Sequence, residues 1–299
     1  MLVTMKEILD RASAENYAVA APNVHTELNA RSFVEAAEEM NAPLIIDFNF
    51  KCNPDIDLMG KILCDIAEKA SVPVAVNLDH GAEYWKIVSA IRAGFTSVMV
   101  DRSSEPFEKN VEETAEIVKI AHAVGVSVEA ELGHVGQADQ YATDRDAALT
   151  SVKDAMSFIE QTGVDCLAIA IGTAHGAYPK GYKPYLDFDR LKEIKDATGG
   201  FPLVLHGSSG TAEEDLYRVC RMGINKVNVA YDMCRACCDT ILEADWSGSN
   251  AYKFWDTLRE APKATLKHLI EVYGSDNKAW VPEHGSLRKL SEQDRVGTE

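Results

Sequence analysis

The stretch "VPVAVNLDHG", residues 72–81, is an apolar run that ends in Asn77, Asp79, His80 and a glycine. Near-continuous apolar runs are typical of strands in a parallel sheet whose two faces are covered by helices. The polar end has two explanations: it caps a strand where the chain meets solvent, or it belongs to a functional site. Only the rest of the chain distinguishes them.

Seven other runs have the same character, with β-branched and apolar residues bounded by turn residues. Together they predict eight strands, at 17–24, 43–50, 72–80, 96–103, 127–133, 165–172, 201–210 and 224–232. A helical pattern lies between each pair of successive runs, and several of these patterns end at glycine. This alternation predicts the α/β class and, within it, a single (β/α)8 TIM barrel.

The two ends of the chain add to the barrel. Residues 5–16 predict a helix that closes its N-terminal end, and residues 251–274 predict one or two extra helices after the eighth strand. The segment 276–299 is polar, and we expect it to fray unless a neighbour holds it. Because no linker divides the chain, we expect one domain, 1–275, followed by a C-terminal tail, 276–299.

Composition narrows the class of protein and of partner. The chain has 299 residues, 46% hydrophobic, with a formal net charge of -17, which argues against nucleic acid or an anionic membrane as a partner. No signal peptide or membrane-length apolar run is seen, so we expect a cytoplasmic protein. Cys52, Cys64, Cys166 and Cys220 are expected as reduced, buried thiols, and "CRACC", 234–238, as small residues on one helix.

Polar side chains end several strands at the same rim of the predicted barrel. His80, His175 and His206 each follow or end a strand, and each is followed by glycine. A histidine at a strand end is most often structural, but three imidazoles that converge with a carboxylate, here Asp79, Glu129 or Glu131, form the ligand set of a catalytic Zn²⁺ site. Neighbours in a strand point to opposite faces, so we expect the backbone to turn beside His80, with a glycine permitting the turn.

The other five histidines are expected to be structural, although His25 follows the first strand at the same rim. Two long connections, 133–150 and 173–186, should also lie at this rim and carry ligand-binding loops. In "LHGSSG", 205–210, glycine and serine at the start of a helix resemble a phosphate cradle, although such residues are also ordinary helix caps.

The segments "NLDHG", "EAELG", "IGTAHG", "LHGSSG" and "KVNVAYD" together resemble the zinc-dependent class II ketose-bisphosphate aldolases, which include fructose-bisphosphate and tagatose-bisphosphate enzymes. The resemblance extends from the first helix to about residue 275. It implies an aldehyde-lyase of carbohydrate metabolism and glycolysis, in which Zn²⁺ stabilises an enediolate while a ketose phosphate is cleaved to dihydroxyacetone phosphate and an aldehyde. It further implies a sugar-phosphate substrate, a homodimer or homotetramer, and room for a monovalent cation.

The resemblance also assigns residues. The metal ligands would be His80, His175 and His206, joined in some states by Glu131. The catalytic acids would be Asp79, at the C4 hydroxyl of the substrate, and Asp139, on the loop after the fifth strand. Substrate or phosphate contacts would come from Asn49, Gly176, Gly207, Ser208, Ser209, Asn228, Ala230 and Tyr231. Lys226 as the Schiff-base lysine of a class I aldolase is the weaker alternative.

Departures from the family pattern lie on the substrate side. Tyr231 stands where a phosphate-binding threonine is usual, Cys234 stands where an arginine is usual, with Arg235 next to it, and Asp47 adds a carboxylate. These changes favour an altered ketose, such as a monophosphate or an unphosphorylated sugar acid. A zinc-dependent sugar epimerase on the same barrel and a non-catalytic sugar-binding relative remain the alternatives.

Overall fold

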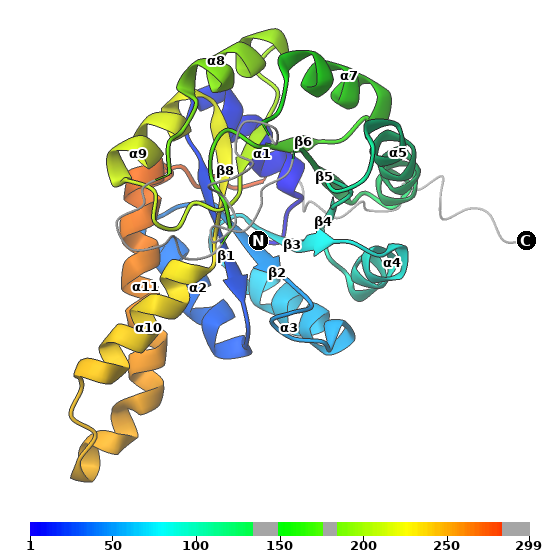
Figure 1. Ribbon diagram of the computed structural model, residues 1–299. Helices are drawn as coiled ribbons and strands as arrows, with labels where there is room; N and C mark the ends of the chain where they lie inside the picture. Colours follow the sequence, from blue (N-terminus) through cyan, green and yellow to red (C-terminus); the bar gives the residue numbers. More distant parts are fainter. Residues whose placement is uncertain (134–148, 176–183, 283–299) are drawn as a thin grey trace, which may run out of the picture.

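The computed structural model describes residues 1–133, 149–175 and 184–282. Eight parallel strands form a closed barrel in sequence order, with helices around it (Figure 1). The strands are β1 Val19–Val24, β2 Leu44–Phe48, β3 Val74–Gly81, β4 Ser97–Val100, β5 Ser127–Leu132, β6 Cys166–Ile169, β7 Leu203–Leu205 and β8 Ile224–Val229. The predicted TIM barrel is therefore confirmed, and each predicted strand lies where the apolar run placed it.

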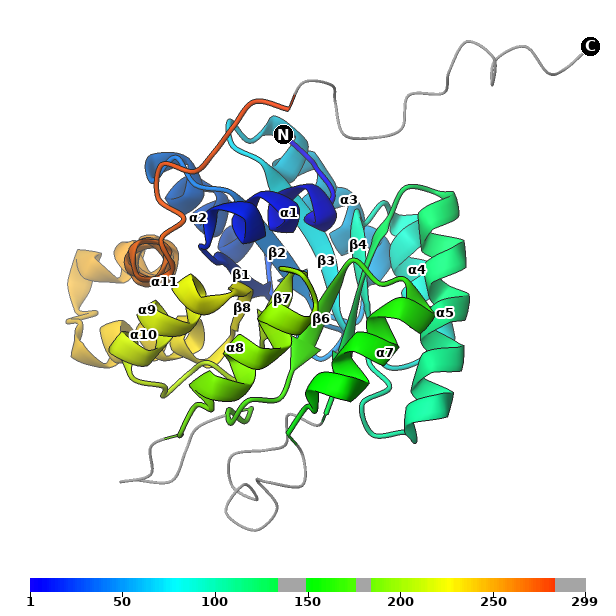
Figure 2. The same ribbon diagram turned by 90° about the horizontal axis from the view of Figure 1, so that it is seen from above.

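Most of the helices connect successive strands and pack on the outside of the barrel (Figure 2). The helices are α1 Met5–Glu15, α2 Glu27–Glu39, α3 Ile56–Lys69, α4 Tyr84–Ala93, α5 Phe107–Ala123, α7 Val152–Thr162, α8 Phe188–Ala197, α9 Glu213–Met222, α10 Tyr231–Glu243 and α11 Phe254–Tyr273, with a 3-10 helix, η2, at Gly248–Lys253. Among the residues described, no helix combines the length and the apolar character needed to cross a membrane.

Helix α1 closes the N-terminal end of the barrel, as predicted. Thr4 caps it, since its hydroxyl accepts from the backbone N–H of Glu7 while the Glu7 side chain accepts from Thr4. Its buried face, which includes Ile8 and Leu9, packs against inward side chains such as Val19. This end of the barrel interior is therefore mainly apolar.

The barrel interior changes character toward the other end. Inward-facing residues further along the strands are polar or charged and fully or almost fully buried: Asp47, Asn77, Asp79, Glu129, Glu131, His206, Lys226 and Asn228. Buried polar groups of this kind are stable only when they are paired or bind a ligand. The fold thus concentrates its buried charge between the centre of the barrel and the rim where the carboxyl ends of the strands meet.

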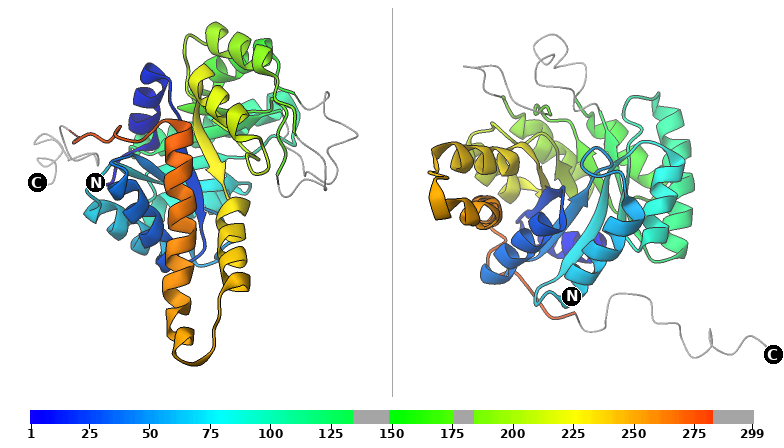
Figure 3. Two further views of the ribbon diagram at one scale, coloured as in Figure 1. Left: turned by 90° about the vertical axis from the view of Figure 1, so that its left-hand side faces the viewer. Right: turned by 90° about the horizontal axis from the view of Figure 1, so that it is seen from below.

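Helix α11 occupies the predicted 251–274 segment, as expected, and α10, which lies before this segment, is a further helix after the eighth strand. Helices α10 and α11 run side by side, joined through η2, and extend beyond the barrel as an arm (Figure 3). Residues 276–282 continue from this arm, and the remainder of the predicted tail, 283–299, lies outside the described residues, so the division into 1–275 and 276–299 stays a prediction.

The cysteines of the described chain are free thiols, as expected. Cys166 and Cys220 are buried, but Cys52 and Cys64 are only half-buried, so the prediction of burial is wrong for these two. Cys52 lies in the loop after β2, where the chain has already left the sheet, and Cys64 lies on the partly exposed side of α3. The "CRACC" residues lie on α10, as predicted.

Candidate metal centre and substrate pocket

Three histidines at the ends of three separate strands meet at the carboxyl rim of the barrel. His80 lies in β3, His175 follows β6 and His206 follows β7. Their ring centroids are 4.9–5.7 Å apart. With Glu131 of β5 they form a group whose ligand atoms all lie within 4.8 Å of one another. Side chains distant in sequence thus form one compact donor set.

The donor set fits a divalent metal ion. His206 Nδ1 lies 3.3 Å from His80 Nε2 and 3.9 Å from Glu131 Oε2. Two imidazole nitrogens bound to one tetrahedral Zn²⁺ at about 2.0–2.1 Å would be about 3.3–3.4 Å apart. The two nitrogens therefore already stand at the separation that a shared ion requires.

An unusual backbone at the end of β3 directs His80 into this group. His80 adopts a φ of 51°, and the register with β4 shifts between Leu78 and Gly81. A left-handed φ is costly for a residue with a Cβ, so the surrounding structure must hold it. This bulge allows Asp79 and His80, which are neighbours in sequence, to serve the same site.

The expectation that Gly81 permits this turn is wrong, because the turn lies at His80. His80 itself takes the left-handed conformation, whereas Gly81 is needed for close packing: a Cβ there would lie 2.4 Å from the carbonyl oxygen of Met99 and 2.7 Å from Ile87. Gly207 combines both needs, because its φ is 67° and a Cβ would lie 2.5 Å from the carbonyl oxygen of Ala174.

Two carboxylates orient the imidazoles from outside the donor set. His80 Nδ1 lies 2.7 Å from Asp101 Oδ2, and His206 Nε2 lies 2.8 Å from Glu129 Oε1. Carboxylates in this position fix the tautomer and the ring orientation of metal-binding histidines. Asp101 follows β4 at the same rim, but no motif in the sequence marks it as part of the site.

The electrostatic environment favours a cation between the imidazoles. Burial lowers the pKa of His80, but Asp79 and Asp101 outweigh burial and raise it to about 10. Burial together with the other two imidazoles lowers the pKa of His175 to about 3. The carboxylates of the site thus stabilise a positive charge on His80, while His175 stays neutral. A divalent ion bound between the imidazoles would replace the proton on His80 and benefit from the same carboxylates.

Asp79 lies beside the donor set and is held by two amides. Its carboxylate accepts from Asn23 Nδ2 at 2.9 Å and from Asn228 Nδ2 at 3.1 Å, and it lies 3.8 Å from His80 Nε2. Burial alone would raise its pKa, but the neighbouring imidazoles and Lys226 keep the pKa below its usual value. Asp79 is therefore an oriented, ionised carboxylate next to the site.

Lys226 does not have the surroundings of a Schiff-base nucleophile. It is fully buried, with Nζ 2.8 Å from Glu129 and 3.2 Å from Asp47. Burial lowers its pKa, but these carboxylates outweigh burial and raise it. A nucleophilic lysine must lose its proton near neutral pH, so this arrangement argues against the class I alternative.

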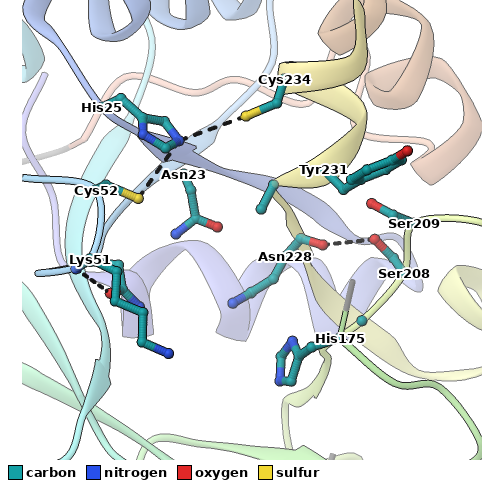
Figure 4. A pocket seen from close by; sticks show the side chains of 13 residues that line it. Asn23, His25, Lys51, Cys52, His175, Ser208, Ser209, Asn228, Tyr231 and Cys234 are labelled. Carbon is teal, nitrogen blue, oxygen red and sulfur yellow. Dashed lines mark hydrogen bonds between the residues drawn. The ribbon is translucent and has the colours of Figure 1, made fainter. Parts of the chain in front are cut away.

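A cavity of about 350 Å³ opens beside His175 (Figure 4). Its lining includes seven residues predicted to contact substrate: Asn49, Gly207, Ser208, Ser209, Asn228, Ala230 and Tyr231. It also includes residues that the sequence did not assign, namely Asn23, His25, Lys51 and Cys52. A second cavity, of about 600 Å³, lies beside the donor set and shares Asn49, Lys51 and His175 with the first.

Two side chains that were predicted to contact substrate form hydrogen bonds to other residues of the protein. The Ser208 hydroxyl donates to the carbonyl oxygen of Asn228 at 2.7 Å, and the Ser209 hydroxyl donates to Asp232 at 3.0 Å. Asn228 Oδ1, in contrast, is buried without a hydrogen-bond partner among the described residues. This oxygen can accept from a ligand hydroxyl.

The expectation that Asp47 adds negative charge on the substrate side is wrong. Asp47 is fully buried in the barrel, paired with Lys226, and accepts from Asn77 at 2.8 Å. Arg235 does not reach the pocket either, because it pairs with Asp239 on the exposed face of α10. Cys234 does line the cavity, where it and Cys52 flank His25 Nε2 at 3.8 and 3.7 Å.

The remaining predictions fall on other parts of the chain. His122 and His268 pair with Asp165 and Glu213, away from the donor set, as expected of structural histidines. Asp139 and Gly176 lie outside the described residues, as do His134 and His284.

Comparison with known proteins agrees with this geometry. The family model described as "Fructose-bisphosphate aldolase class-II" matches residues 3–278. Fructose-bisphosphate aldolases of Thermus caldophilus and Geobacillus stearothermophilus are 39% and 38% identical to the chain, each over 93% of it and over 100% and 99% of the relative. The crystal structure of the YdjI aldolase from Escherichia coli K12 superimposes with a TM-score of 0.84 at 33% identity, covering 94% of this chain and all of that one. The chain belongs to the class II fructose-bisphosphate aldolase family.

Proposed function

We propose that the protein is a zinc-dependent aldolase that reversibly cleaves a ketose phosphate to dihydroxyacetone phosphate and an aldehyde. One observation carries this proposal: the ligand atoms of His80, Glu131, His175 and His206 lie within 4.8 Å of one another beside a cavity. Bound there, Zn²⁺ would supply Lewis-acid stabilisation of the negative charge that develops when a carbon–carbon bond breaks. The membership in a metal-dependent aldolase family supports the same activity.

The residues beside the donor set would orient substrate and move protons. Asp79 would exchange a proton with the C4 hydroxyl, because its carboxylate is held in place by the amides of Asn23 and Asn228. Asn228 Oδ1 would accept from a substrate hydroxyl. A second proton transfer, at the carbon left behind, is assigned to Asp139, and a backbone contact is assigned to Gly176; both remain predictions.

The far wall of the first cavity favours a substrate with only one phosphate. Burial lowers the pKa of His25 and raises the pKa of Cys234, and it raises the pKa of Cys52 to about 11, so the three side chains are neutral near pH 7. A second phosphate dianion would find no charge partner in these three side chains and would depend on Lys51, which also lines the cavity. We therefore propose a ketose monophosphate, with the phosphate against Gly207–Ser209 at the opposite wall.

A screen of ketoses tests the activity and the substrate separately. With zinc-loaded enzyme, release of triose should be faster from ketose 1-phosphates than from fructose or tagatose 1,6-bisphosphate, by about tenfold in kcat/KM, equivalent to about 1.4 kcal/mol. A preference for the bisphosphates would overturn only the monophosphate proposal. Product isomers without triose would indicate the epimerase, and inertness toward every ketose would indicate a binding protein.

The arm formed by α10, η2 and α11 supports a proposal about assembly. Large apolar side chains on it are exposed, among them Leu242 (78%), Tyr252 (87%) and Trp255 (66%). Clustered exposed apolar side chains mark protein interfaces. We propose that this arm packs against a second copy of the chain, as a homodimer or homotetramer. A cytoplasmic location and a second, monovalent cation remain predictions.

A further inference from the structure

A line of buried charges connects the centre of the barrel to the metal-ligand group. Lys226 Nζ donates to Glu129 Oε2 at 2.8 Å and forms an ion pair with Asp47 Oδ2 at 3.2 Å. All three side chains are completely buried. Among the described residues, Lys226 is the one lysine or arginine that is fully buried. Burying three charges in a barrel core is costly, and packing alone does not require it.

The second oxygen of Glu129 links this line to the site. Glu129 Oε1 lies 2.8 Å from His206 Nε2, so the imidazole donates its Nε2–H to the carboxylate. The other nitrogen, Nδ1, then carries the lone pair and faces His80 Nε2 at 3.3 Å. The contact to Glu129 thereby selects the tautomer of His206 that can bind a metal through Nδ1.

We propose that Lys226 is a positioning residue, which acts through Glu129 to hold His206 in the orientation that binds the metal ion. The proposal rests on the zinc-dependent function proposed above. Lys226 anchors one oxygen of Glu129, which leaves the other oxygen aimed at His206. Without Lys226, Glu129 and Asp47 would stand in the core with no cation between them, and Glu129 would lose its fixed orientation.

Zinc affinity is the measurement that isolates this role. Lys226→Met should weaken the apparent zinc affinity about 10–100-fold, the range typical of outer partners of metal ligands. The affinity is measured by competition with a chromogenic chelator, and circular dichroism checks that the metal-free protein is folded.

Lys195→Met is the matched control. Lys195 is a partly buried lysine bound to Ser13, Phe201 and Asn225, away from the histidines, and its loss should change stability while leaving zinc affinity within about twofold.

A double-mutant cycle tests the route through Glu129. Glu129→Ala leaves the Lys226–Asp47 pair intact and should itself weaken zinc binding about 10–100-fold. In the Glu129→Ala background, Lys226→Met should add less than about threefold, because both changes remove the same support. If Lys226→Met does not fold, Lys226→Gln, which loses the charge but keeps a hydrogen-bond donor, takes its place, and unchanged zinc affinity in that folded protein overturns the inference.

Three results would overturn the inference. The first two are an unchanged zinc affinity in folded Lys226→Met and an unchanged zinc affinity in Glu129→Ala. The third is a double variant whose fold-loss of zinc affinity equals the product of the two single losses. Each leaves the proposed function intact, provided that the wild-type protein binds zinc and cleaves ketoses. Failure of the wild-type protein in both respects would instead refute the proposed function.

Discussion

Replacing Asp79 by Asn should lower kcat/KM for ketose cleavage by about a thousandfold while the protein still binds its metal. Proton transfer by a positioned side chain contributes typically 10²–10⁴-fold to a rate. Asn has nearly the shape of Asp but cannot accept a proton at neutral pH. Zinc content should stay near that of wild type, because Asp79 lies 3.8 Å from His80 Nε2 and outside the four-residue donor set.

Asp165→Asn is the control for this variant. Asp165 is another buried carboxylate that contacts a histidine, His122, at 2.8 Å, but it lies outside the site. Its substitution should leave kcat/KM within about threefold. A folded, zinc-loaded Asp79→Asn protein that keeps more than about a tenth of wild-type activity would contradict the proton-transfer role.

Replacing His206 by Ala should abolish tight zinc binding and, with it, cleavage. The loss of affinity should exceed the 10–100-fold typical of outer partners, because a coordinating nitrogen is removed. Thermal unfolding of the metal-free protein should remain cooperative, since Glu129 keeps its ion pair with Lys226. The measurement is zinc content after dialysis against a defined free-zinc concentration, together with the rate of triose release.

His122→Ala controls for the loss of an imidazole. His122 is partly exposed and pairs with Asp165 far from the donor set. The His122→Ala protein should retain wild-type zinc content and activity. Stoichiometric zinc in His206→Ala, or equal loss of zinc in both variants, would exclude His206 as a ligand.

The barrel was predictable because its physical signals are local. Each strand of a covered parallel sheet is a short apolar run, and each helix between two strands has its own periodicity, so all eight strands could be located without knowledge of the fold. The convergence of His80, His175 and His206 followed from the topology, since the carboxyl ends of parallel strands meet at one rim.

The details that were missed depend on register and on contacts between distant strands. The left-handed φ of His80 arises at a bulge against β4, which no local pattern signals. Asp47 looked like a substrate-side charge because its partner, Lys226, lies far along the sequence in β8 and meets it only when the barrel closes. Similarly, His25 reaches the pocket because β1 lies beside β8.

Zinc content measured together with cleavage activity through removal and return of the metal tests the central claim most directly. Purified protein should carry about one zinc per chain, should lose triose release in proportion to zinc removed by a chelator, and should recover it when zinc alone is added back. Activity that persists in zinc-free protein, or zinc that is bound equally well when His80, His175 and His206 are all replaced by Ala, would contradict it.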